Sequence, residues 1–116
     1  MKIAMVILDK KLDSKLDQPF VRAYYFLIHD TEINKNKLID NLAIKVTGGA
    51  GIKVAQTLVD KKIDILIVFR LGENPVKILE GGNIQLFRTV DETAQKNLEK
   101  FKNGELIKLE EFHLSY

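Results

Sequence analysis

The sequence of 116 residues is long enough for one domain with a substantial core and too short for two. Hydrophobic residues make up 46% of it and charged residues 29%, as in ordinary soluble globular proteins. The net charge is only +2, and acidic and basic residues are interleaved along the chain. We therefore expect no nucleic-acid partner, because a phosphate-binding surface needs clustered lysine and arginine.

The chain contains no cysteine, which excludes a disulfide framework and a metal site made of thiolates. This composition fits a reducing compartment, and we expect the protein to be cytoplasmic. The apolar N-terminus reaches Asp9 and Lys10 too early for a signal peptide, and no segment approaches membrane-spanning length. A membrane partner is therefore not expected.

The first strands predict a mixed sheet. Residues 3–8 form a nearly unbroken aliphatic run, typical of a strand buried on both faces. The charged segment 9–18, which carries Ser14, follows it and is a candidate wall of a binding site, because open α/β sheets bind ligands at the carboxyl ends of central strands. Residues 22–29 and 36–39 then predict an antiparallel hairpin.

A glycine-dense turn at residues 46–52 leads directly into a helical pattern. The free N–H groups and positive dipole end of that helix would point into the turn and form a general pocket for an anion or polar ligand. The turn has neither the Walker nor the dinucleotide-binding spacing. An equally good interpretation is that the glycines only allow the helix to pack closely on a strand. The predicted buried face of the helix consists of Ile52, Ala55, Leu58 and Val59.

Two more strands and two more helices follow. Residues 64–69 predict a second buried strand, parallel to the first. Asn74 and Pro75 predict the N-cap and first residue of a short helix that stops at Gly81 and Gly82.

The last part of the chain predicts a parallel strand nearer the sheet edge at residues 84–87, and a capping box at 89–92 that begins the last helix. Gly104 ends this helix, and the tail 105–116 either adds an edge element or stays mobile. The expected buried face of the helix consists of Val90, Ala94, Leu98 and Phe101. Together the elements predict an α/β fold, a three-layer α/β/α arrangement with a mixed five-stranded sheet.

Four segments, at residues 19–26, 48–53, 70–72 and 82–84, occur in the order and spacing of one known family. On these segments the chain resembles the dinitrogenase iron-molybdenum cofactor biosynthesis family, a small domain of nitrogenase accessory proteins, over residues 1–104. The resemblance implies a ribonuclease H-like fold and a single domain over residues 1–116. It also implies a non-catalytic role in binding or carrying an iron-sulfur or iron-molybdenum cluster, or a precursor of one.

By position, the resemblance places a ligand surface around the glycine turn. The residues that it implies are Ser14, Arg22, Gly48, Gly49, Ala50, Gly51, Arg70 and Gly72. The chain departs from the family pattern at Val21, where glycine is usual, and at residues 8–10, where the first loop usually starts with Ser, Asp or Gly. Without cysteine, a cluster would be held by histidine, by carboxylate, or by charge and hydrogen bonds to its sulfides.

The arginines and the histidine near the predicted strand ends each have a functional and a structural interpretation. Arg70 directly ends a central strand, which favours a role as an anion donor, whereas for Arg22 a surface ion pair is an equal alternative. His29 is a candidate metal ligand, although a lone histidine is more often exposed or simply hydrogen-bonded.

Two functions therefore remain open at this point. The first is a cluster-binding or carrier protein whose partners are cluster-assembly or recipient proteins; the second is a metal-independent module that binds a metabolite or a partner protein at the same surface. We expect a monomer or a weak homodimer through the hairpin edge. Nuclease chemistry is not expected, because Asp9 and Asp64 lie at opposite ends of their strands and cannot share a metal. Hydrolase chemistry has no support either, because no histidine is placed near Ser14.

Overall fold

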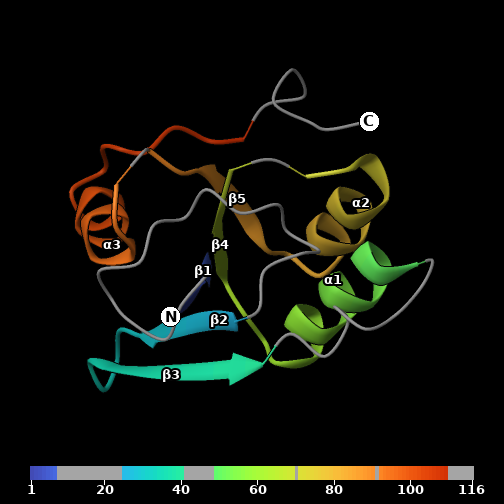
Figure 1. The fold of residues 1–116 in the computed structure, drawn as a ribbon, viewed down its shortest axis with the longest axis horizontal. Helices are drawn as coiled ribbons and strands as arrows, with labels where there is room; N and C mark the ends of the chain where they lie inside the picture. Colours follow the sequence, from blue (N-terminus) through green and yellow to red (C-terminus); the bar gives the residue numbers. More distant parts are fainter. Residues whose placement is uncertain (8–24, 41–48, 70, 91, 110–116) are drawn as a thin grey trace.

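A computed structural model describes residues 1–7, 25–40, 49–69, 71–90 and 92–109 (Figure 1). The elements in chain order are β1 (Lys2–Ile7), β2 (Tyr25–Asp30), β3 (Lys35–Asp40), α1 (Ala50–Asp60), β4 (Ile65–Val68), α2 (Glu73–Gly81), β5 (Gln85–Arg88) and α3 (Ala94–Lys102). The five strands form one sheet in the order β3-β2-β1-β4-β5. β1, β2 and β3 pair antiparallel, whereas β1, β4 and β5 pair parallel, which confirms the predicted mixed sheet.

Helices cover both faces of this sheet, with α1 and α2 on one side and α3 on the other (Figure 1). Alternate residues of the central strand β1 supply both layers of core. Ala4 and Val6 pack with residues of α1 and α2, while Ile3, Met5 and Ile7 pack with residues of α3. Burial on both faces explains why this strand has no polar alternation, and it confirms the three-layer α/β/α prediction.

Helix α1 is rotated relative to the prediction. Its buried residues are Val54, Ala55 and Leu58, whereas Ile52 is 45% exposed, so the prediction for Ile52 was wrong. Successive residues lie about 100° apart around a helix, and Gly51 therefore takes the inward position in the first turn. The inward face begins with a residue that has no side chain, which hid its true direction in the sequence.

Helix α2 begins earlier than predicted. Its N-cap is Gly72, in an extended conformation with no side-chain cap, and Asn74 lies inside the first turn. The prediction failed because Pro75 is tolerated anywhere in a first turn, where backbone N–H groups need no intrahelical acceptor. The predicted end is confirmed, since the helix ends at Gly81 and Gly82 is its C-cap.

Helix α3 begins later than predicted. Its N-cap is Thr93, whose side-chain Oγ1 accepts a hydrogen bond of 3.2 Å from the Lys96 N–H, so the capping box at 89–92 was wrong. At that point the chain still follows the sheet, because the Thr89 N–H donates to the Val68 carbonyl. Gly104 has a φ of 72° just after the C-cap of the helix, which confirms the predicted stop.

The segment after α3 adds an edge element to the sheet, as one of the two predictions for the tail had it. Lys108 forms an antiparallel bridge with Phe87 of β5, and the Arg88 N–H donates to the Ile107 carbonyl. Residues 110–116 lie outside the described residues. Among the helices described, none is long and apolar enough to cross a membrane.

Candidate functional site

Three strand ends and three helix starts meet at one edge of the sheet. β1, β4 and β5 are parallel, so their carboxyl ends lie at the same edge of the sheet. The helices α1, α2 and α3, which precede or follow these strands, begin on that side of the sheet (Figure 1). We call it the carboxyl edge. Its described residues are Ile7, Phe69 and Arg88 at the strand ends and Gly49, Gly72 and Thr93 at the helix N-caps. This is the edge at which open α/β sheets place their ligands.

Gly49 begins helix α1 in the left-handed conformation, with φ 67° and ψ 13°. A Cβ built on Gly49 would meet no atom of the described residues within 4 Å, so the position requires glycine for its backbone angles and not for lack of space. The N-cap makes no side-chain hydrogen bond, and the first turn carries no acidic residue. Within the described residues, the first-turn N–H groups of α1 are therefore left for solvent or a ligand.

The other helix starts at this edge differ from α1 in chemistry. α2 also begins at a glycine without a side-chain cap, but Glu73 in its first turn supplies a negative charge. α3 is capped by the hydroxyl of Thr93. Only the start of α1 combines an uncapped turn with no acidic side chain, among the three helices that the structure describes.

The structure brings several of the predicted site residues to the carboxyl edge. Gly49, Ala50 and Gly51 form the start of α1, and Gly72 forms the start of α2. The remaining predicted residues lie outside the described part of the chain and stay predictions: Ser14, Arg22, Gly48 and Arg70.

His29 lies at the opposite end of the sheet. It pairs with Ile3 near the amino end of β1 and is 3% exposed. Its Nδ1 lies 2.7 Å from the side-chain oxygen of Asn36, so we assign Nδ1 as the donor and leave the lone pair on Nε2. Nε2 is buried and has no hydrogen-bond partner among the described residues. The structure therefore does not bring His29 together with the glycine turn.

The described residues contain no group of three or more His, Asp or Glu side chains that could hold a metal ion. Asp64 lies just before β4, at the amino end of that strand as predicted, and its carboxylate accepts a hydrogen bond of 2.8 Å from the Lys2 N–H. Asp9 lies outside the described residues. The carboxylate of Asp64 is thus committed to the edge of the sheet opposite the glycine turn.

Arg88 is a candidate binding residue that the sequence reasoning missed. It ends β5 at the carboxyl edge, in register with Val68, and its guanidinium carbon lies 5.4 Å from the centre of the Phe69 ring. None of the described carboxylates forms an ion pair with it. The signal was available, because Arg88 follows a predicted parallel strand just as Arg70 does.

Asn97 is a second residue that the sequence reasoning missed, and it fixes the loop between β5 and α3. It is fully buried, and its Oδ1 accepts from the Val90 N–H at 2.9 Å. Its Nδ2 donates to the carbonyl oxygens of Val90, Glu92 and Thr93 at 3.2, 3.2 and 3.0 Å. One side chain thereby holds the backbone that follows Arg88.

Comparison with solved structures finds the same architecture in other proteins. A putative NifB protein from Thermotoga, determined by NMR, is 32% identical with a TM-score of 0.82, and the match covers 93% of this chain and 92% of that one. The apo form of the orange protein from Desulfovibrio gigas gives a TM-score of 0.87 at 24% identity, covering 93% and 92%. A putative dinitrogenase from Methanocaldococcus jannaschii gives 0.69 at 24% identity, covering 94% of each chain. The two matches at 24% identity support the fold alone.

Comparison with protein families gives one match over most of the chain. No curated protein sequence matches at a significant level. The family described as dinitrogenase iron-molybdenum cofactor matches residues 1–104, the span over which the sequence motifs resemble it. Together with the putative NifB relative at 32% identity, this match shows that the chain belongs to the dinitrogenase iron-molybdenum cofactor family.

Proposed function

We propose that this protein is a non-catalytic binding or carrier protein for an iron-sulfur or iron-molybdenum type cluster, or for a precursor of one. Membership of a family named for the iron-molybdenum cofactor supports this class of ligand. The observation that carries the proposal is the start of α1, where an uncapped first turn without acidic residues opens at the carboxyl edge. The cluster is cargo in this proposal, handed on to assembly or recipient proteins.

The chemistry of the site would differ from that of most cluster proteins. The chain has no cysteine, so thiolate ligation is excluded. Sulfide atoms of an anionic cluster can accept hydrogen bonds from backbone N–H groups, and the first-turn groups after Gly49 are suited to this role. Arg88 adds a guanidinium at the same edge, and we propose that Arg22 and Arg70 contribute as the family resemblance implies.

The test is anaerobic incubation with iron and sulfide, or with a preformed cluster, followed by desalting and measurement of retained iron and visible absorption. Ile52→Glu places a carboxylate in the first turn of α1, at a residue that is 45% exposed. The helix dipole favours that charge, so the fold should be preserved, while an anionic cluster is repelled. We expect at least about a tenfold loss of affinity, which corresponds to about 1.4 kcal/mol.

Ile52→Gln is the matched control, because glutamine has nearly the same shape as glutamate but carries no charge. Retention by the wild type and by Ile52→Gln, with loss in Ile52→Glu and Arg88→Gln, would support the proposal. If the wild type retains no iron, the proposal is wrong for this chain. The complete lack of cysteine favours the alternative in that case, a metal-independent module that binds a metabolite or a partner protein at the same edge.

A further inference from the structure

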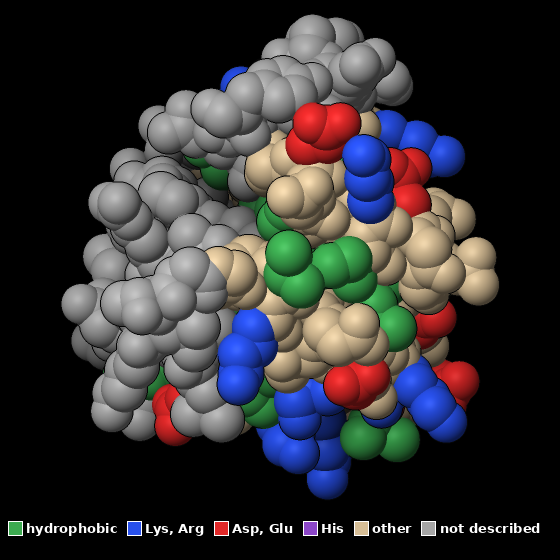
Figure 2. All heavy atoms as spheres, turned by 90° about the vertical axis from the view of Figure 1, so that its right-hand side faces the viewer, with side chains coloured by type: hydrophobic (Ala, Val, Ile, Leu, Met, Phe, Trp, Pro, Cys, Tyr) green, Lys and Arg blue, Asp and Glu red, His purple; other side chains and the backbone are tan. Residues whose placement is uncertain are grey.

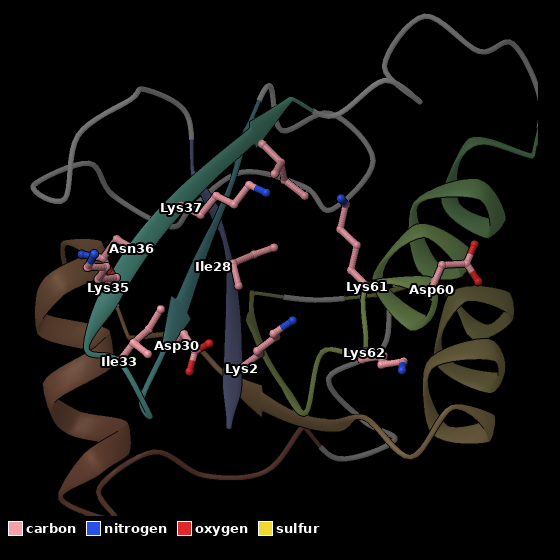
Figure 3. Close-up of a pocket in the computed structure, with 11 residues that line it drawn as sticks. Lys2, Ile28, Asp30, Ile33, Lys35, Asn36, Lys37, Asp60, Lys61 and Lys62 are labelled. Atoms are coloured by element: carbon pink, nitrogen blue, oxygen red, sulfur yellow. The ribbon is translucent and has the colours of Figure 1, made fainter.

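A separate pocket lies at the other end of the sheet, between the β2–β3 hairpin and the end of α1 (Figure 3). Its volume is about 540 Å³, within the range of roughly 300 to 1,000 Å³ that is typical of small-molecule sites. Figure 2 shows the α1 and α2 side of the molecule, where Lys and Arg side chains gather at the bottom. The C-terminal ends of α1 and β3, which line this pocket, lie at that end (Figure 1). The lysines that line it are Lys2, Lys35, Lys37, Lys61 and Lys62.

These lysines are not neutralised by the acidic side chains nearby. Among the described residues, five lysines and two aspartates line the pocket, an excess of three positive charges. Asp30 accepts a hydrogen bond from the Glu32 N–H in the hairpin turn, and Asp60 accepts one from Gln56 on α1, both at 3.0 Å. Within the described part of the chain, none of the five ammonium groups forms an ion pair.

Lys62 occupies a position that favours glycine. It follows the C-cap of α1 with a φ of 58°, and the Ile63 N–H closes the helix by donating to the Leu58 carbonyl at 3.2 Å. The other non-glycine residues with positive φ in the described ranges are Asn34 and Asn83, and asparagine tolerates this conformation. A lysine there is strained, and Lys62 is one of the residues that line the pocket.

The floor of the pocket is apolar. Ile28 is buried beneath it, Ile39 is half-buried, and Ile33 is 62% exposed at its mouth. Lys37 faces the same side of the sheet as Ile28, because the two residues are paired in register. Figure 3 shows the side chains of Lys2, Lys37 and Lys61 arranged around Ile28. The pocket therefore presents a rim of ammonium groups above an isoleucine surface.

We propose that this pocket binds a small organic polyanion, with two or three negative charges on phosphate or carboxylate groups and an apolar body that covers the isoleucines. Lysines that form no ion pair among the described residues match the charges, and the excess of three positive charges on the described lining residues agrees with this number. The site does not depend on the proposed cluster site. The 11 residues of α1 separate the two by about 16 Å, from a rise of about 1.5 Å per residue.

The test is an NMR titration of the ¹⁵N-labelled protein with 1-naphthyl phosphate, a dianion with an apolar ring, and in parallel with inorganic phosphate. We expect saturable shifts of the amide signals of Lys2, Ile28, Lys37 and Lys61, with an affinity at least about tenfold higher for 1-naphthyl phosphate. Absence of saturable shifts, or shifts confined to Gly49 and Gly51, would overturn the proposal.

Two double variants distinguish binding at this pocket from a general effect of the positive charge of the protein. Lys37→Gln with Lys61→Gln should lower the affinity about tenfold or more. Lys96→Gln with Lys102→Gln removes the same charge from exposed positions on α3 and should leave it unchanged. Equal losses in the two double variants would contradict a specific site. Ile33→Ser should weaken 1-naphthyl phosphate severalfold and leave inorganic phosphate unaffected; an equal effect on both would refute the apolar contact.

Discussion

Gly82 allows α1 and α2 to approach one another, and replacing it with alanine tests this close contact. A Cβ on Gly82 would lie 2.6 and 3.0 Å from the two methyl carbons of Val59 and 3.3 Å from its Cβ, whereas carbon atoms prefer about 3.5 to 4.0 Å. Val59 is β-branched and stiff within a helix, so it cannot rotate away cheaply. We expect Gly82→Ala to lower the free energy of unfolding by about 1 to 3 kcal/mol.

Gly81→Ala is the matched control, since a Cβ there meets no atom of the described residues within 4 Å and Gly81 has no positive φ. Alanine is the better helix former and restricts the unfolded chain, so this variant should gain about 0.5 to 1 kcal/mol. Urea unfolding followed by circular dichroism measures both. In a double-mutant cycle, Val59→Ala should rescue Gly82→Ala by about 1 to 2 kcal/mol. Equal stability of Gly81→Ala and Gly82→Ala, or additive effects in the cycle, would refute the packing argument.

Three other substitutions test parts of the structure by thermal or urea unfolding. Asn97→Ala should lower the free energy of unfolding by about 2 to 4 kcal/mol, because it leaves buried backbone groups around Val90 unpaired. Gln95→Ala, on the exposed side of α3, is the control and should be nearly neutral. A small effect at Asn97 would contradict its role in holding the loop. Lys62→Gly should raise stability by about 1 kcal/mol by relieving the left-handed conformation, and no gain would argue against strain there. His29→Leu removes a buried nitrogen that lacks a partner, so the change in stability should stay within about 1 kcal/mol, and a loss above about 3 kcal/mol would show that the imidazole is required.

The sheet could be predicted from the sequence because its strongest signals are strongly periodic or continuous. The aliphatic run of β1 and the apolar run of β4 predicted two buried parallel strands, and both are found at the centre of the sheet. The aromatic strand β2 and its return strand β3 were predicted as a hairpin, and their register confirms it. In each case the residues of the strand itself have a pattern that is sufficient to predict the strand.

Helix starts were harder to predict because several residue patterns compete there. The signals at Asn74 and at residues 89–92 are both acceptable helix starts in isolation, yet the helices begin at Gly72 and Thr93. For α3 the start depends on how far the chain stays hydrogen-bonded to the neighbouring strand, since the Thr89 N–H still donates to the Val68 carbonyl, and local propensity does not record this.

The candidate site could be predicted only in part. The glycine turn marked the start of α1 in the sequence, and its edge of the sheet followed from the parallel strands. Arg88 follows a predicted strand and could have been considered, but its contact with Phe69 is visible only in the structure. The lysine pocket joins Lys2, Lys37 and Lys61 from three distant segments, so its charge could not be recognised in a chain whose charges look evenly spread.

The measurement that tests the proposed function most directly is an amide NMR map of the protein after anaerobic loading with a cluster, compared with the unloaded protein. We predict that the amide signals of Gly49, Gly51, Gly72 and Arg88 shift or broaden, because these residues lie at the carboxyl edge. The signals of Lys61 and Lys62, at the far end of α1, should remain unchanged. Changes centred instead on His29, or no selective change in a protein that retains iron, would contradict a cluster site at the glycine turn.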